Sequence, residues 1–205
     1  MDAPQANEDQ PGDHRRWLRD LELAHFEPTS PGMPYWLPRG VAVMRALREH
    51  WRHSHERMGY LEVSTPLLAR DPLYASSGHL EHFADNMFFV DAGEGDRMGL
   101  KPVNCPGTMV IFRSRRRSHR ELPLRLSCED PLHRNERSGV LTGLLRVQVF
   151  HQDDAHIFVT PEQESGEVVD LLRHAERLYA SLGLGFRLRL GGPPRRRRKP
   201  RPIPA

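Results

Sequence analysis

Cysteine and long apolar runs are the scarcest features of this sequence. Two cysteines, Cys105 and Cys128, occur in 205 residues. They are too few for the disulfide framework of a small secreted domain, and they favour a reducing compartment. No run reaches the roughly 18 apolar residues that a membrane-spanning helix needs, and no signal-peptide pattern stands at the start. We therefore expect a cytoplasmic protein without a membrane partner.

Excess basic charge is also absent outside the C-terminal end. The sequence carries 30 basic and 27 acidic side chains and has a pI near 9.2. Six of the basic residues lie in residues 191–205, which contain no acidic residue. Removing these six leaves 24 basic against 27 acidic side chains, a net charge of about −3. The body of the chain is therefore not a nucleic-acid-binding module by charge alone.

Apolar periodicity divides the chain into three segments. Residues 1–12 are polar and aperiodic, and residues 191–205 combine like charges with five prolines. We expect both ends to be disordered, because neither offers an apolar face that could dock. Residues 13–190 are long enough for one domain with a hydrophobic core.

Helix and strand patterns both occur within that domain, and they predict an α+β fold. The clearest helices run from Val41 to Met58 and from Thr160-Pro161 to about Leu182. In the first helix, His50, His53 and His55 share no metal-binding face, so we expect them to be solvated. Strands are expected at residues 60–63, 86–90, 97–100, 122–126, 146–156 and 186–190.

The stretch from Leu132 to His156 is the most informative. Its second half alternates with the period of a β-strand, and its first half ends in Arg134 and Glu136, also two residues apart. A loop containing Ser138, Gly139 and Gly143 joins the halves, which suggests a β-hairpin with a long loop. One face of this hairpin would carry Arg134, Glu136, Arg146, Gln148, Phe150, Gln152, Asp154 and His156.

Most polar strand faces are simply solvated, and this remains the alternative interpretation. The composition of this face argues against it. Arginines suit bidentate contact with phosphates, and an aromatic ring can stack on a base. A carboxylate and a histidine can hold an ammonium group and a metal. The face therefore has the side chains that a site for a nucleotide and an amino acid would need.

Two further residues are candidates on weaker grounds. Cys105 lies between Asn104 and Pro106-Gly107, an irregular setting that suits a ligand or a nucleophile, although a buried structural thiol is equally compatible. His79 follows Gly78 in an expected loop, where a functional and a solvated side chain are equally plausible.

Four motifs in this order resemble the class II aminoacyl-tRNA synthetases, and within them the threonyl-tRNA synthetases. They are KPVNCPG, LPLR, HRNERSG and QDDAHIF, and the resemblance covers about residues 13–190. It implies an antiparallel sheet flanked by helices, and a ligase that uses ATP and Mg²⁺ to activate threonine for transfer to tRNA-Thr. It also implies a homodimer formed through the segment around Pro66.

The resemblance assigns roles residue by residue. Arg134 matches the arginine that binds the ATP α-phosphate, and Arg146 matches another near the phosphates. Glu136 and Phe150 match the residues that contact adenine and stack on it. The remaining matches are Gln152 and Asp154 for the threonine amine, Cys105 and His156 for two of three Zn²⁺ ligands, and His79 for a histidine near the transfer site.

The sequence also departs from the family. Thr108 replaces a usual histidine, Val103 a methionine, Gln148-Val149 an Arg-Gly pair, and Pro131-Leu132 a Ser-Cys pair. The third zinc ligand, the third class II motif and the anticodon-binding domain would all lie beyond residue 190. We therefore expect a partial catalytic domain that is incomplete at its C-terminus, with weak zinc binding, poor selection of threonine over valine and little aminoacylation.

Two other functions compete with this interpretation. One is a non-catalytic, synthetase-like remnant that binds RNA through residues 191–205. The other is a small amino-acid-activating enzyme that loads something other than tRNA.

Overall fold

The computed structural model describes residues 13–189 and 191. We expect disorder in residues 1–12 and 191–205. Apart from residue 191, these residues lie outside the described part of the chain. The chain divides into two compact units, Met1–Thr160 and Pro161–Ala205. Over the part of the chain that is described, no helix is long and apolar enough to cross a membrane.

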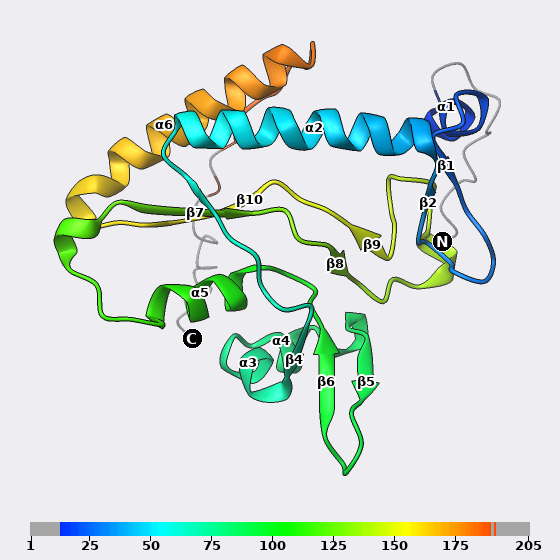
Figure 1. Ribbon diagram of the computed structural model, residues 1–205, viewed down its shortest axis with the longest axis horizontal. Coiled ribbons are helices and arrows are strands. Elements are labelled where there is room, and N and C mark those ends of the chain that lie inside the picture. Colours follow the sequence, from blue (N-terminus) through cyan, green and yellow to red (C-terminus); the bar gives the residue numbers. More distant parts are fainter. Residues whose placement is uncertain (1–12, 190, 192–205) are drawn as a thin grey trace, which may run out of the picture. The chain divides into compact units, whose positions relative to one another are not determined.

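A three-stranded sheet forms the centre of the first unit (Figure 1). Its middle strand is β7 (Leu124–Cys128), which pairs antiparallel with β10 (Asp154–Phe158) and parallel with β3 (Leu61–Glu62). Leu126 and Cys128 of the middle strand are almost fully buried. No described strand pairs with the outer side of β10.

Three smaller sheets complete the first unit. The hairpin of β1 and β2 lies near its N-terminus, and β4, β5 and β6 form an antiparallel sheet with β6 in the middle. The strands are β1 (Ala24–His25), β2 (Tyr35–Trp36), β4 (Leu68–Arg70), β5 (Phe89–Asp91), β6 (Arg97–Leu100), β8 (Leu132–His133) and β9 (Val149–Phe150). Together with the helices, they confirm the α+β class.

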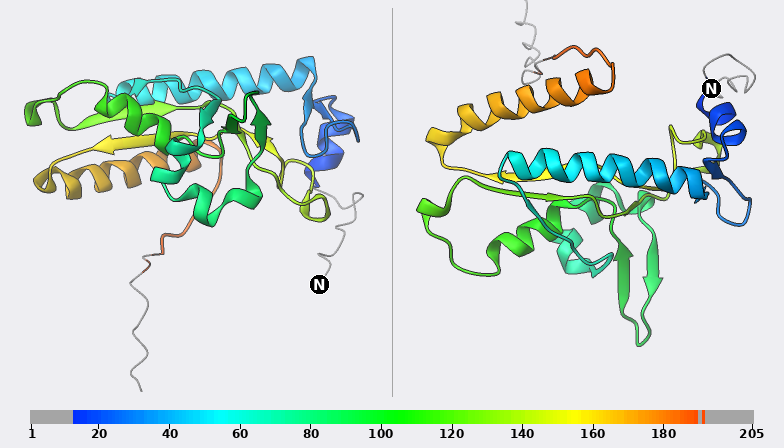
Figure 2. Two further views of the ribbon diagram at one scale, coloured as in Figure 1. Left: turned by 90° about the horizontal axis from the view of Figure 1, so that it is seen from below. Right: turned by 45° about the horizontal axis from the view of Figure 1, so that its top comes forward.

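Helices lie on both sides of the central sheet (Figures 1 and 2). The long helix α2 (Pro38–Arg57) runs along one side, and α5 (Cys105–Arg113) packs on the other. The shorter helices are α1 (His14–Asp20), α3 (Asp71–Ser76), α4 (His79–His82) and the 3-10 turns η1 (Ala84–Asn86), η2 (His119–Glu121) and η3 (Ser138–Val140).

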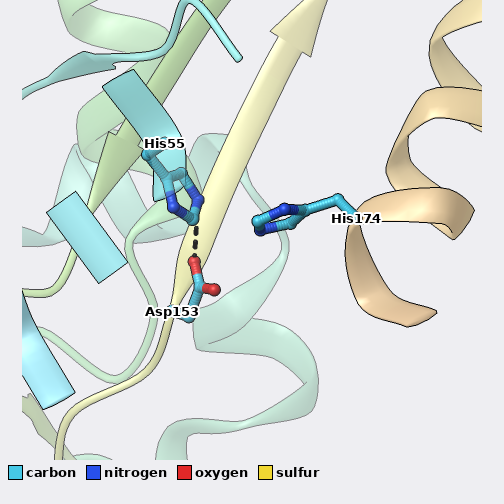
Figure 3. Close-up of side chains that lie close together, drawn as sticks. All are labelled: His55, Asp153 and His174. Carbon is cyan, nitrogen blue, oxygen red and sulfur yellow. Dashed lines mark ion pairs between the residues drawn. The ribbon is translucent and has the colours of Figure 1, made fainter. Parts of the chain in front are cut away.

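Helix α2 corrects one expectation about histidines. His50 and His53 are exposed as predicted, but His55 is only 4% exposed. It lies one turn after the buried Trp51 and therefore on the same helix face. One ring nitrogen contacts the Trp51 carbonyl at 3.0 Å, and the other contacts Asp153 at 3.0 Å (Figure 3). Trp51 Nε1 also donates to this carboxylate, at 2.8 Å.

The hairpin between residues 132 and 150 is confirmed, but its second strand is shorter than expected. Strands β8 and β9 pair antiparallel, and a bridge between Thr142 and Arg146 closes the loop. Residues 151–153 leave the strand, because His151 turns to the carbonyl of Glu129 and Asp153 turns to α2. The single strand predicted for residues 146–156 is therefore two strands with different partners.

The second unit contains α6 (Pro161–Ser181), which begins at the predicted proline. The prediction of a strand at residues 186–190 is wrong for residues 186–189, which the structure describes. Residues 184–189 have no regular secondary structure. Instead, the ring of Phe186 packs on Tyr179 of α6, with ring centroids 5.0 Å apart. A strand needs a neighbouring strand for its backbone hydrogen bonds, and the described part of this unit holds none.

Candidate active site

The start of α5 presents the first group of candidate residues. Asn104 is the N-cap residue, Cys105 the first helical residue, and Pro106 lies in the first turn, where its missing N–H costs nothing. Asn104 is fully buried, and its Nδ2 donates to Asp154 Oδ2 at 3.1 Å. Cys105, expected in irregular backbone, therefore begins a helix, and it is exposed.

Cys105, Asp154 and His156 form a cluster in which one ligand atom from each lies within 4.8 Å of the others. Asp154 and His156 are two residues apart on β10, so they share one face of the strand. Phe158, the next residue on that face, stacks on Phe112 of α5 with centroids 3.8 Å apart. This packing turns the face toward α5 and brings Asp154 and His156 to Cys105.

Cys105 is exposed as a residue, but partial desolvation of its thiol raises the thiol pKa, and the nearby Asp154 carboxylate raises it further. Nδ1 of His156 is buried and has no hydrogen-bond partner among the described residues. A thiol, a carboxylate and an imidazole are the donors that zinc takes in proteins. A divalent cation would compensate the charge of a thiolate beside a carboxylate, so the residues present fit a zinc-type metal.

The second cysteine does not belong to this cluster. Cys128 is 1% exposed, and burial raises the pKa of its thiol to about 12. Thiolates rather than thiols bind metals and attack electrophiles, so Cys128 is a packed structural residue.

Arg134 and Phe150 form a second group. The Arg134 guanidinium carbon lies 4.9 Å from the centroid of the Phe150 ring. Pairing of β8 with β9 explains this contact, because Leu132 stands opposite Phe150 and Arg134 follows two residues later. A guanidinium beside an aromatic ring can hold a phosphate and a stacked base at the same time.

Glu136 and Arg146 form a third group, with Arg146 donating to the Glu136 carboxylate at 2.7 Å. Gln148 donates from Nε2 to the Glu136 backbone carbonyl at 2.9 Å. The Arg146 side chain is about half exposed, whereas that of Glu136 is largely buried. The guanidinium of Arg146 is therefore open to solvent, whereas the carboxylate of Glu136 is largely buried.

The segment from Pro102 to Cys105 joins the cluster to the arginine group. The Pro102 carbonyl accepts a hydrogen bond from Arg134 Nε at 3.3 Å, and two residues later Asn104 donates to Asp154. The pair of Arg134 and Phe150 and the cluster of Cys105, Asp154 and His156 are thus attached to one short piece of backbone.

A buried ion pair anchors this segment, and nothing in the sequence singled it out. Lys101 Nζ donates to Asp130 at 2.8 Å and to the Thr65 hydroxyl at 2.8 Å. The same carboxylate accepts from the Thr65 backbone N–H at 2.8 Å and from Ser64. Burial acts to raise the pKa of Asp130, but the hydrogen bonds from Lys101, Thr65 and Ser64 outweigh it and hold the pKa below its usual value.

Two candidate residues are not joined to these groups. His79 begins α4, and its ring contacts the Ser77 hydroxyl at 2.9 Å and the edge of Phe83. Gln152 is exposed. Over the part of the chain that the structure describes, no hydrogen bond links either residue to the cluster or to Arg134.

Comparison with known families matches residues 88–193 to the tRNA synthetase class II core domain (G, H, P, S and T). The chain belongs to this family. Its relatives include a threonine--tRNA ligase of Desulfosudis oleivorans, 43% identical over 182 residues, and one of Thermotoga neapolitana, 44% identical over 188 residues. These matches cover 89% and 91% of this chain but 28% and 29% of the relatives, so the chain spans less than a third of their length.

Solved structures agree with this assignment. The RNA-binding domain of threonyl-tRNA synthetase from Cryptosporidium parvum Iowa II is 43% identical, with a TM-score of 0.80. That match covers 83% of this chain and 42% of the other. A putative threonyl-tRNA synthetase from Aeropyrum pernix is 32% identical with a TM-score of 0.78, covering 84% and 41%. A prolyl-tRNA synthetase of Giardia lamblia, 20% identical with a TM-score of 0.73 over 82% of this chain and 35% of that one, shares the fold.

Proposed function

We propose that this chain provides the nucleotide-binding and amino-acid-binding part of a threonine--tRNA ligase. The observation that carries the proposal is the segment from Pro102 to Cys105, which contacts Arg134 at one end and Asp154 at the other. In the reaction, the carboxylate of threonine attacks the α-phosphorus of ATP and the bond to the bridging oxygen breaks, which releases pyrophosphate, so the two substrates must meet. A shared piece of backbone sets the distance between their binding groups.

The ATP half of the proposal uses the two arginine groups. Arg134 binds the α-phosphate and offsets the charge that develops there, and a bound Mg²⁺ would supply further compensation of the phosphate charge. Phe150 stacks on the adenine and Glu136 contacts its edge. Arg146 and Gln148 hold Glu136 in place through its carboxylate and its backbone carbonyl. The exposed guanidinium of Arg146 contacts the phosphates.

The threonine half uses the cluster at α5. Asp154 and Gln152 hold the ammonium group, and Cys105 and His156 hold Zn²⁺. When bound, the metal would supply a Lewis acid that distinguishes the side-chain hydroxyl of threonine from a methyl group. His79 acts at the later transfer of threonine to tRNA-Thr; its position on α4 outside the cluster suits contact with a second substrate.

Binding of a non-hydrolysable threonyl-adenylate analogue tests the proposal. Threonyl-sulfamoyl-adenosine should bind the 205-residue chain at least about tenfold more tightly than AMP, because it fills both halves of the site. Isothermal titration calorimetry measures both affinities. Equal affinities would mean that the amino-acid half is not a binding site, and a synthetase-like remnant without catalysis would then be the better interpretation.

We further propose that the chain forms a homodimer through the segment around Pro66. Pro66 is exposed, and so are Leu61 on the edge strand β3 and Leu47 on α2, at 57% and 48%. Exposed apolar side chains on adjacent elements are typical of a subunit interface. Sedimentation equilibrium should give a dimer that Leu61→Glu dissociates, whereas Leu145→Glu at an 80% exposed loop position should not. A monomeric wild-type chain would contradict the proposal.

A further inference from the structure

We propose that Asp153 is a positioning residue for the amino-acid half of the site. Helix α2 holds Asp153 through His55 and Trp51, and this contact, the α2 clamp, fixes the next residue, Asp154, in its place beside Asn104. The inference rests on the proposed function, in which Asp154 binds the ammonium group of threonine. It adds a residue that contacts no substrate and acts only through its neighbour.

One carboxylate oxygen of Asp153 receives both contacts of the α2 clamp. Trp51 Nε1 donates to Oδ1 at 2.8 Å, and Nε2 of His55 lies 3.0 Å from the same atom (Figure 3). The His55 ring is itself oriented, because its Nδ1 donates to the Trp51 carbonyl at 3.0 Å and a carbonyl only accepts. Trp51 and Tyr60 pack against the His55 ring, with centroids 5.1 and 4.8 Å away. Two buried rings with fixed orientation thus hold one oxygen.

The same helix also holds the chain just before Asp153. Arg48 lies three residues before Trp51 and therefore on the same face of α2. Its Nε donates to the Glu129 carboxylate at 2.9 Å, and His151 Nδ1 donates to the Glu129 backbone carbonyl at 2.7 Å. Helix α2 therefore fixes residues 151–153 at two points, directly at Asp153 and through Glu129 at His151.

Asp153 and Asp154 are held from opposite sides of the central sheet. Consecutive residues of an extended chain point to opposite faces. Asp153 turns to α2, whereas Asp154 accepts from Asn104 at the start of α5, at 3.1 Å, and these two helices lie on opposite sides of the sheet (Figures 1 and 2). The pairing of β10 with β7 begins only at Asp154. The α2 clamp therefore fixes the chain at the residue where the sheet does not yet hold it.

Calorimetric titration with two ligands tests the inference. Asp153→Ala should weaken binding of threonyl-sulfamoyl-adenosine about tenfold, because a displaced Asp154 no longer meets the ammonium group. The affinity for AMP should not change, since Arg134 is held by the pairing of β8 with β9 and not by α2. Asp153→Asn keeps an acceptor for Trp51 Nε1 and should recover part of the loss.

Glu62→Ala is the matched control. It also removes a carboxylate that is bound to α2, but this carboxylate lies on β3 and pairs with Arg52. The variant should bind both ligands as the wild-type protein does. A merely structural contact between α2 and the sheet would affect both ligands alike and would not be rescued by Asp153→Asn.

A measurement on the wild-type chain covers the case in which the Asp153 variants fail to fold. Coupling between two contacts is reciprocal, so binding of an ammonium group at Asp154 must in turn stabilise the α2 clamp by the same factor. The indole N–H of Trp51 should therefore exchange with solvent about tenfold more slowly with threonyl-sulfamoyl-adenosine bound than with AMP bound. Trp51→Phe assigns this resonance, because it keeps a buried ring and removes the N–H.

The failure of the inference and the failure of the proposed function give different results. If the wild-type chain prefers threonyl-sulfamoyl-adenosine to AMP but Asp153→Ala keeps this preference, the inference is wrong and the proposed function stands. Equal exchange of the Trp51 indole with either ligand bound leads to the same conclusion. If the wild-type chain binds both ligands equally, the proposed function fails, and the inference fails with it.

Discussion

Asp130→Ala should lower the free energy of unfolding by about 3–5 kcal/mol, because it leaves the charge of Lys101 buried without its partner. The Lys101 side chain is 4% exposed, and the substitution also removes the acceptor of the Thr65 N–H. Urea unfolding followed by circular dichroism measures the change. Asp96→Ala removes the partner of Arg70 in an exposed ion pair and should cost less than about 1 kcal/mol. Similar costs for the two variants would contradict the assigned role of the buried pair.

The stabilisation by Asp130 should depend on pH. Its pKa is held below the ordinary value in the folded protein, so its contribution is present above the unfolded pKa of about 3.9 and is lost as the pH falls through the folded pKa. The difference in stability between the wild-type protein and Asp130→Ala should therefore be constant near neutral pH and shrink in acid. A difference that grows below pH 4 would mean that the pKa is raised instead.

Arg134→Ala should weaken binding of threonyl-sulfamoyl-adenosine by about 10–100-fold, since hydrogen bonds to a charged group contribute about 1.5–3 kcal/mol each. The substitution also removes the cation beside Phe150. Arg134→Lys should recover part of the loss, because it restores the charge but not the planar fork. Calorimetric titration of the folded variants measures these affinities.

Arg137→Ala is the control for this prediction. Arg137 has the same charge, lies three residues away and is exposed. The Arg137→Ala variant should bind the analogue with the affinity of the wild-type protein. If Arg137→Ala weakens binding as much as Arg134→Ala does, the effect comes from general charge rather than from a phosphate contact.

Local patterns in the sequence predicted the parts of the site that depend on local geometry. The two-residue spacing of Asp154 and His156 put both on one strand face, and the structure has them so on β10. The hairpin between the two halves of residues 132–156 was also predicted from the strand patterns and the loop between them, whereas the pairing of residues 132–133 with 149–150 was not. Each of these contacts is set by strand alternation or by a hairpin, which a short stretch of sequence encodes.

Contacts between distant segments were not predictable in this way. Asn104 and Asp154 are 50 residues apart, and only the packing of α5 on β10 brings them together. The break of the strand at residues 151–153 depends on α2, which offers His55 and Trp51 to Asp153. Burial of Lys101 likewise depends on Thr65 and Asp130, two residues from other parts of the chain.

The spatial arrangement changes one expectation about substrate selection. With two zinc ligands, the sequence predicted poor discrimination between threonine and valine. Asp154 lies in the same cluster as Cys105 and His156, so the group proposed for the threonine ammonium and the groups proposed for the metal lie side by side in this chain. Selection against valine should therefore be retained in this chain, because valine cannot fill a position built for a hydroxyl group.

The affinity ratio of threonyl- to valyl-sulfamoyl-adenosine, measured calorimetrically on the zinc-loaded 205-residue chain, tests the central claim most directly. The account predicts that the threonyl analogue binds at least about 100-fold more tightly, since a site that contacts a hydroxyl leaves a polar position unfilled by valine. Removing the metal with a chelator should reduce this ratio to near one. Equal binding of the two analogues by the zinc-loaded chain would contradict the account.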